Sequence, residues 1–287
     1  MSPVAALRRP LGDDLAAFVT LLQRLGVPHR VSEESGEQVL WVPDETLAEQ
    51  VRELYARYPG GAPYAEAPAA PRPAATGQWL ARLRSLPVTS LILLLTFAVA
   101  LATWFGDNLR LVSWLTFSDF RIDGDYAWFL PLGDSLAAGQ WWRLVSPMLV
   151  HFGVLHLAMN SLWLWELGRR VEWRQGSLLL LALVLLYSLV SNVAQFVFGG
   201  PAIFGGLSGV LYGLLGHCWL FQRLAPNPHY RLPPGVVGMM LVWLLVCLSG
   251  LISALGLGEI ANAAHVGGLL IGCATGVLGG LLARRRR

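Results

Sequence analysis

The sequence contains no lysine, so all 21 of its basic residues are arginine. Without lysine, the chain cannot form a serine/lysine catalytic dyad. Charged residues make up only 14% of the 287 residues, whereas hydrophobic residues make up 55%. This composition is too apolar for an ordinary soluble domain, and the formal net charge of +3 is too small to indicate a nucleic-acid partner. We therefore expect a small soluble domain fused to a polytopic membrane domain.

Cysteine is also scarce, and two common sequence signals are missing. Cys218, Cys247 and Cys273 lie in apolar runs without the spacing of metal ligands, which predicts buried free thiols. The chain has no HExxH motif, so the zinc-protease pattern is excluded. Residues 1–30 include acidic residues and no sustained apolar core, which argues against a cleaved signal peptide.

Residues 1–60 predict a small cytoplasmic α+β domain. The apolar positions of a first amphipathic helix are Leu15, Phe18, Val19, Leu22 and Leu25. The stretch "RVSEESGEQVLWVP" predicts two short strands around a Ser-Gly turn. A second helix is expected after the N-cap Asp44, with Leu47, Val51 and Leu54 as its apolar stripe. The single histidine, His29, is expected in a solvated loop.

Residues 61–77 form an Ala/Pro-rich linker, and a membrane domain is expected over residues 78–283. Trp79, Arg82 and Arg84 at its start are typical of a segment at the lipid headgroups. Six apolar runs predict an all-α bundle of six membrane-spanning helices. The runs cover residues 88–105, 145–166, 177–198, 207–222, 235–256 and 261–283.

The placement of arginine predicts how these helices are oriented. With six spans, one side of the membrane carries most of the arginines near the spans: Arg82, Arg84, Arg169, Arg170, Arg174, Arg223, Arg231 and the basic tail 284–287. The other side carries only Arg110, Arg121 and Arg143, in a long first loop that also holds five aspartates. Because cytoplasmic loops are rich in Lys and Arg, we expect both termini in the cytoplasm.

The first loop, residues 106–143, leaves two interpretations open. It contains "YAWFLPLG" and "GQWWRLV", and such mixtures of aromatic and polar residues suit a segment that lies in the outer membrane interface. It can equally be a long periplasmic loop.

Polar residues at membrane depth are candidates for function because they are expensive to bury there. These residues are His151, His156 and Asn160 in the second span, Ser208 in the fourth, and Asn262 and His265 in the sixth. His156 and Asn160 are spaced i, i+4 and therefore share one helix face. His217 and His229 are expected toward the cytoplasmic side, and we assign them no chemistry.

Small residues repeat in the two spans that carry Ser208 and His265. The sixth span has small residues every fourth position, namely Ala264, Gly268, Gly272, Gly276 and Gly280. The fourth span has a second small face, formed by Gly209, Gly213 and Gly216. If the two faces pack closely, Ser208 and His265 meet at the outer end of the helix pair. Such stripes also serve simply as packing devices in polytopic proteins, and histidines near helix ends often only bond a carbonyl.

A meeting of Ser208 and His265 would allow nucleophilic catalysis. A neutral imidazole can take the proton of a serine hydroxyl near neutral pH, and the resulting oxyanion then needs donors. The available donors are His156, Asn160 and the backbone N–H of Ser208 or Leu207. The spans contain no aspartate to orient the histidine, so a dyad is favoured over a triad.

Four motifs resemble those of the rhomboid intramembrane serine proteases of the bacterial GlpG type. They are "GGLSG", "HFGVLHLAMN", "AHVGGLLIG" and the "WWR" of the first loop, and they occur in family order within residues 78–283. The front domain and linker also resemble the cytoplasmic domain of that subgroup. The resemblance implies a six-helix fold in a bacterial inner membrane, with the active site opening toward the periplasm.

The same resemblance assigns roles residue by residue. It makes Ser208 the nucleophile and His265 the general base and acid, and it places His156 and Asn160 in the oxyanion hole. Tyr212 matches the tyrosine that packs against the catalytic imidazole. Gly206, Gly209, Gly268 and Gly272 support the site.

The resemblance also implies a substrate class. Such enzymes cut transmembrane segments of other membrane proteins near their outer ends, in contact with membrane lipid and without nucleic acid or a cofactor. The natural substrate and the oligomeric state stay open. Two alternatives also remain: an inactive rhomboid-like chaperone or scaffold, and a six-span transporter. The intact Ser208/His265 pair argues against the first, and the lack of inverted repeats or acids within the spans argues against the second.

Overall fold

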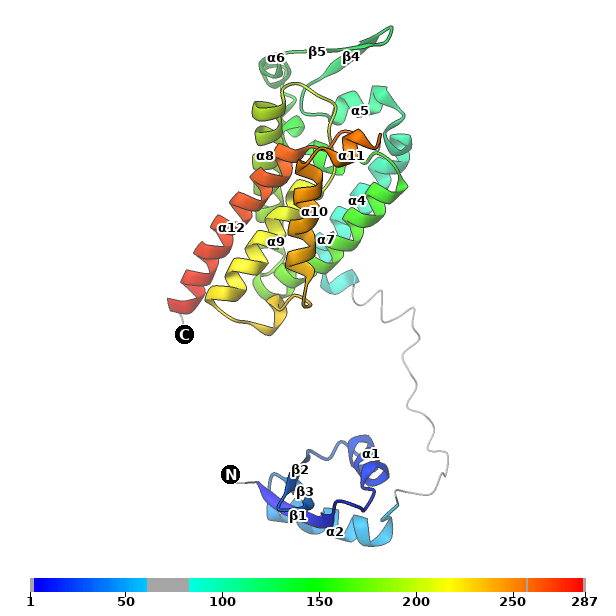
Figure 1. Ribbon diagram of the computed structural model, residues 1–287, viewed down its shortest axis with the longest axis vertical. Coiled ribbons are helices and arrows are strands. Elements are labelled where there is room, and N and C mark those ends of the chain that lie inside the picture. Colours follow the sequence, from blue (N-terminus) through cyan, green and yellow to red (C-terminus); the bar gives the residue numbers. More distant parts are fainter. Residues whose placement is uncertain (1–2, 61–82, 257, 286–287) are drawn as a thin grey trace. The chain divides into compact units, whose positions relative to one another are not determined.

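The computed structural model describes residues 3–60, 83–256 and 258–285 (Figure 1). The chain divides into two compact units, Met1–Ala75 and Thr76–Arg287. The predicted linker 61–77, together with Trp79 and Arg82, lies outside the described residues, as do the last two arginines of the predicted tail.

The front unit is the predicted α+β domain, with one strand more than expected. Its antiparallel sheet has the order β1-β3-β2. The strands are β1 (Val4–Pro10), β2 (Arg30–Glu34) and β3 (Glu37–Val42). The predicted hairpin around Ser35 and Gly36 is confirmed as β2 and β3. The sequence analysis missed β1, whose segment "VAALRRP" ends in proline, a residue that is disfavoured in strands. The sheet tolerates this proline because β1 is an edge strand.

Two helices cover one face of this sheet, α1 (Ala16–Arg24) and α2 (Glu45–Arg57). Asp44 is confirmed as the N-cap of α2, since its side chain accepts a hydrogen bond of 2.9 Å from Leu47 N. Phe18 and Leu22 are fully buried in the core. The prediction for Leu25 is wrong: α1 ends at Arg24, so Leu25 leaves the apolar face and is 57% exposed.

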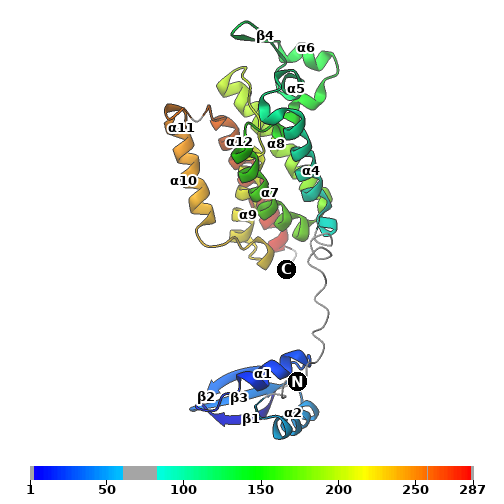
Figure 2. The same cartoon turned by 90° about the vertical axis from the view of Figure 1, so that its right-hand side faces the viewer.

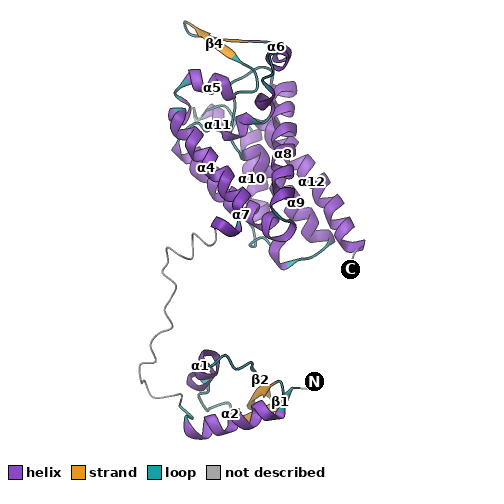
Figure 3. Ribbon diagram, turned by 180° about the vertical axis from the view of Figure 1, so that it is seen from behind, coloured by secondary structure: helices purple, strands orange, loops and turns teal. Residues whose placement is uncertain are grey.

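The second unit is a helical bundle, as the predicted all-α class requires (Figures 2 and 3). Its longer helices are α4 (Pro87–Ala102), α7 (Val154–Gln175), α8 (Ser177–Gly199), α9 (Ser208–Leu224), α10 (Val236–Leu248) and α12 (Asn262–Arg285). Short helices α5 (Leu109–Leu115), α6 (Leu132–Ala137) and α11 (Leu251–Ala254) lie in the connections. By length and composition α8 and α12 can cross a membrane, and α4 and α10 are shorter apolar helices.

The second and fifth spans differ from their predictions. The expected span 145–166 begins with a 3₁₀ turn, Ser146–Leu149, and α7 then runs from Val154 to Gln175. The arginines predicted to lie in the next loop are therefore on α7, where Glu166 pairs with Arg169 and Arg170. The expected span 235–256 is broken after Leu248, because Gly250 adopts φ +75° and ends the helix.

Helix α9 lies at the centre of the bundle, and its residues from Gly209 to Cys218 are all buried. It packs most extensively against α12. A Cβ on Gly268 or Gly272 would clash with the backbone carbonyl of Gly209 or Gly213, respectively. The two backbones are thus in direct contact, which confirms the predicted pairing of the small faces.

A buried glutamate that the sequence analysis did not single out ties three helices together. Glu172 on α7 accepts hydrogen bonds from Val88 N at 2.8 Å, Thr89 N at 2.9 Å and Thr89 Oγ1 at 2.7 Å. It also accepts one from Ser177 Oγ at 2.7 Å, at the start of α8. The carboxylate therefore satisfies the free N–H groups at the start of α4 and complements the helix dipole.

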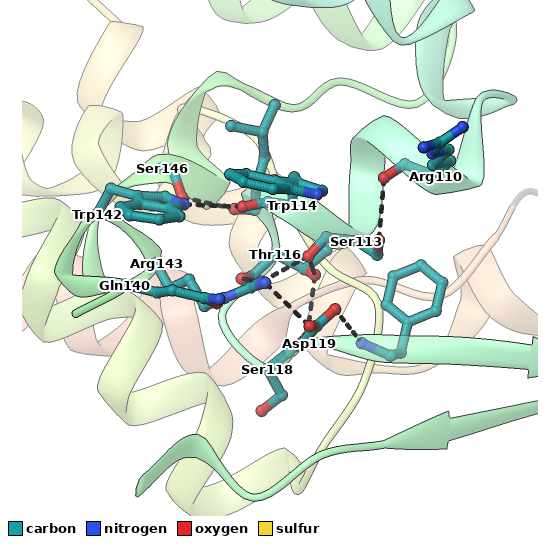
Figure 4. A network of polar contacts seen from close by, with 12 residues as sticks. Arg110, Ser113, Trp114, Thr116, Ser118, Asp119, Gln140, Trp142, Arg143 and Ser146 are labelled. Carbon is teal, nitrogen blue, oxygen red and sulfur yellow. Dashed lines mark hydrogen bonds and ion pairs between the residues drawn. The ribbon is translucent and has the colours of Figure 1, made fainter. Parts of the chain in front are cut away.

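The connection between α4 and α7 is folded rather than open. It contains a hairpin of β4 (Phe120–Asp123) and β5 (Tyr126–Phe129). Arg143 lies at the centre of this connection, and only 1% of the Arg143 surface is exposed. Arg143 forms an ion pair of 3.3 Å with Asp119 (Figure 4). It also donates to Gln140 Oε1 at 2.6 Å and to the carbonyls of Ser113 and Thr116. Burial lowers the pKa of Arg143 and Asp119 opposes this shift, so the guanidinium keeps its charge.

We expect Arg143→Ala to lower the free energy of unfolding by roughly 3 kcal/mol, because Asp119 and two buried carbonyls would lose their donor. Thermal unfolding of the purified protein in detergent measures this loss. Arg110→Ala is the control, since Arg110 is exposed and lies in the same connection. Equal melting temperatures for the two variants would contradict the structural role of Arg143.

Gly272→Leu should both destabilise and inactivate the protein, because the new side chain would force α12 away from the carbonyl of Gly213. Thermal unfolding and turnover are measured side by side. Ala274→Leu is the matched control, because Ala274 is exposed on the same helix. A fully active Gly272→Leu variant would refute the requirement for close packing.

Candidate active site

Ser208 is the first residue of α9, and the loop before it is tightly held. Gly206 N donates to Pro147 O at 3.0 Å. A Cβ on Gly205 would lie 2.9 Å from the carbonyl oxygens of both Pro147 and Val150, so only glycine fits there. The strap of residues 144–150 thus fixes the path of the chain into Ser208.

Helix α8 holds this strap in place. Asn192 Nδ2 donates to Leu144 O at 2.9 Å, and Ser188 Oγ donates to Val145 O at 3.0 Å. Both side chains are buried. Asn192 supplies the partner for the Leu144 carbonyl, and Ser188 adds a second donor to the Val145 carbonyl, which also accepts from Met148 N at 3.2 Å.

His265 lies in the first turn of α12 and meets Ser208. The distance between His265 Nε2 and Ser208 Oγ is 2.8 Å, which is a hydrogen bond. His265 is 6% exposed, and its Nδ1 has no partner among the described residues. When the serine hydroxyl donates to Nε2, the neutral ring carries its own proton on Nδ1. Nothing in the described part of the chain orients this ring through a carboxylate, so the pair has the geometry of a dyad.

Tyr212, one turn along α9 from Ser208, packs against the His265 ring. The ring centroids are 5.0 Å apart with an interplanar angle of 44°. The Tyr212 hydroxyl donates to Met240 O on α10 at 3.0 Å. The tyrosine therefore fixes one side of the imidazole and ties α9 to α10.

His156 and Asn160 lie in the first two turns of α7. A Cβ on Gly206 would stand 2.7 Å from His156 Nε2 and 3.9 Å from Ser208 Oγ, so the His156 ring packs directly on Gly206, next to Ser208. Asn160 Nδ2 donates to His156 O at 2.9 Å, which occupies one of its two N–H groups. The structure thus brings His156 next to the serine loop, whereas Asn160 bonds to its own helix.

Backbone donors also converge on Ser208. The first N–H groups of a helix have no partner within the helix, and Leu207 and Ser208 begin α9. The N–H of Gly206 is already used by Pro147. The amides of Leu207 and Ser208 are the first of the donors that remain at this turn.

Sequence reasoning missed Gln195 and Ser191 on α8. Gln195 Oε1 accepts a hydrogen bond of 3.1 Å from Ala264 N and so caps α12 just before His265. Ser191 lines a cavity of about 10 Å³ beside Ser208, together with Ser188 and Asn192. Such a cavity has room for about one water molecule, and its lining combines these polar side chains with apolar ones such as Met148 and Phe204. Neither residue could be singled out from the sequence, because polar residues at this spacing are expected on any apolar helix.

The remaining histidines lie apart from this pair or have other partners. His217 bonds Gln175 Oε1 at 3.0 Å and Thr275 Oγ1 at 3.1 Å, within a network that joins α7, α9 and α12. His151 is buried, with Nδ1 3.1 Å from Leu149 O, and its ring lies 4.9 Å from that of His156. Among residues 3–60, 83–256 and 258–285, no three His, Cys, Asp or Glu side chains are grouped as metal ligands.

Comparison with known protein families agrees with this architecture. The family model of the Rhomboid domain matches residues 138–281, which span the strap, the Ser208 loop and the helices α7 to α12. The model of the Rhomboid N-terminal domain matches residues 1–69. With its apolar helices, the chain is a membrane protein, and it belongs to the rhomboid family of intramembrane proteases.

Proposed function

We propose that this chain is an intramembrane serine endopeptidase that cleaves transmembrane segments of other membrane proteins through a Ser208/His265 dyad. The observation that carries the proposal is the hydrogen bond of 2.8 Å between His265 Nε2 and Ser208 Oγ. A serine is a weak nucleophile until a base removes its proton, and this geometry supplies the base.

Acylation follows from these two groups. His265 Nε2 takes the Ser208 proton while Oγ attacks the scissile carbonyl carbon, which gives a tetrahedral oxyanion. The C–N bond then breaks as His265 gives the proton to the leaving nitrogen, and an acyl-enzyme remains. In the second half His265 takes a proton from water, whose oxygen attacks the ester carbon; the C–Oγ bond then breaks as His265 returns the proton to Oγ, which frees Ser208 and the carboxylic acid product. The small cavity beside Ser208 is where such a water can wait.

The oxyanion would form beside Ser208 Oγ, where the donors gather. His156 Nε2 lies against Gly206 next to Ser208, and the amides of Leu207 and Ser208 are at the start of α9. Asn160 can contribute its second N–H group. Donors fixed before the reaction stabilise the developing charge without reorganisation, and removal of one such donor costs about 3 kcal/mol in other enzymes.

The substrate must present a peptide carbonyl inside a membrane protein, so a helical segment has to unwind locally. Helix-weakening or small residues are therefore expected at the cut. The resemblance to bacterial rhomboid proteases implies an inner-membrane location, and the arginine distribution supports cytoplasmic termini, which would put Ser208 near the periplasmic face. The partners are then transmembrane proteins and lipid.

We expect Ser208→Ala and His265→Ala each to abolish cleavage of a membrane-embedded substrate while the protein still folds and inserts. Because both residues serve one proton transfer, the loss in the double variant should not exceed the larger single loss. Turnover of a reconstituted transmembrane substrate and labelling by a fluorophosphonate give the two readouts. His229→Ala is the control, since His229 lies in the loop after α9.

Near-normal turnover in either single variant would contradict the proposed Ser208/His265 mechanism. A folded wild-type protein that resists fluorophosphonate and cleaves no transmembrane segment would instead favour the inactive chaperone or scaffold.

Deleting residues 1–76 should leave catalysis largely intact. The front unit forms its own core, and we see no two-state element that would couple it to Ser208. Turnover per active site, titrated with a covalent inhibitor, is compared for the full-length and truncated proteins in the same lipid. If the truncated protein binds inhibitor normally but turns over more than about tenfold slower, residues 78–283 are not an autonomous catalytic unit.

A further inference from the structure

The turn that follows α4 has a strained backbone. Trp104, Phe105 and Gly106 are consecutive and have φ of +50°, +54° and +102°. Such values cost an L-residue other than glycine about 1–2 kcal/mol each. Elsewhere among the described residues, only Ser35 in the front domain is a non-glycine residue with positive φ. Strain of this kind persists only where the surroundings hold it.

Two contacts hold this turn against the segment that leads into α7. Phe105 O accepts a hydrogen bond of 3.1 Å from Gly153 N. A Cβ on Gly106 would stand 2.5 Å from Phe152 Cδ1, so the Phe152 ring packs directly on the backbone of Gly106. The turn therefore sets the position of residues 152 and 153.

The backbone of Phe152 in turn reaches His156. Phe152 N lies 3.4 Å from His156 Nδ1, and the hydrogen points at the ring nitrogen. A backbone N–H can only donate, so Nδ1 must accept and carries no proton. The proton of a neutral His156 is then on Nε2, the atom that lies against Gly206 beside Ser208.

We infer that the Trp104–Gly106 turn is a positioning element for the oxyanion site, because it holds the Phe152 amide against His156 and so keeps His156 in the neutral tautomer protonated on Nε2. This inference rests on the proposed function of His156 as an oxyanion donor. The opposite tautomer would turn a lone pair toward the developing negative charge and repel it. The strain at Trp104 and Phe105 thus has a catalytic use.

Nitrogen NMR of the full-length protein in detergent, labelled with nitrogen-15 histidine, measures the tautomer directly. The signals of His156 are identified by their loss in His156→Gln. At neutral pH we expect Nδ1 to resonate as a bare ring nitrogen and Nε2 as a protonated one. A proton on Nδ1, or an average of both tautomers, would overturn the inference. This readout needs no turnover, so it is independent of whether Ser208 proves catalytic.

Gly106→Ala tests the positioning role. The added methyl group should displace Phe152 and lower kcat about tenfold or more, with KM within about twofold, because the loss arises in the transition state. The His156 signals should then no longer show a single tautomer. Gly139→Ala is the matched control: Gly139 also has a positive φ, +82°, but nothing lies within 4 Å of its Cβ position.

The double variant Gly106→Ala/Phe152→Ala removes the clashing ring and keeps the amide, so it should recover most of the lost kcat and the single tautomer. Equal losses in Gly106→Ala and Gly139→Ala would show that backbone strain alone is responsible and would overturn the role of the Phe152 contact. Loss of kcat with an unchanged His156 tautomer would do the same.

Discussion

The direct contact between the backbones of α9 and α12 is the constraint on which the rest of the bundle depends. Ser208 begins α9 and His265 lies in the first turn of α12, so the separation of the two side chains follows from the separation of the two helix axes. Glycines at positions 268 and 272 remove the side chains that would otherwise keep the axes apart. In a membrane, apolar side chains gain little free energy by moving from lipid into a helix interface. Such close packing is therefore a main source of helix association.

Polar side chains secure the places where regular helix bonding stops, and most of them are buried. Glu172 satisfies the start of α4, and Gln195 satisfies the start of α12. Arg143 donates to the carbonyls at the end of α5, and Asn192 donates to a carbonyl of the strap before α7. Inside an apolar bundle no water competes for these groups, so each partner both stabilises its segment and fixes its position. The proposed active site lies among these tethered segments, at the ends of helices rather than in their middles.

The strained turn after α4 fits the same arrangement. It is remote from Ser208 in sequence, yet its contacts reach the segment that carries His156 through Phe152 and Gly153. Under the proposed function, the groups around the oxyanion position are therefore held by three separate parts of the chain: this turn, the strap at Pro147 and the first turn of α9.

The sequence alone determined the class of the molecule. Its composition, arginine placement and apolar runs predicted a small α+β domain and an all-α membrane bundle, because hydrophobic periodicity and length are local properties. The two stripes of small residues also predicted that α9 and α12 would pack. The Ser208/His265 hydrogen bond followed from that pairing, since both residues stand at the same end of their stripes.

Only the tertiary structure decided the remaining features, because each depends on contacts between residues far apart in the chain. The edge strand β1 and the 3₁₀ strap before α7 carry no periodic signal, and the break after Leu248 depends on the positive φ of one glycine. The bonds of Glu172 to Val88, of Arg143 to Asp119 and of Gln195 to Ala264 join residues from 24 to 84 positions apart, which no local pattern records. The His156 ring accepts its bond from Phe152, four positions away, but Phe152 is held by the turn at residues 104–106, and that contact depends on position in space and not on spacing in the sequence.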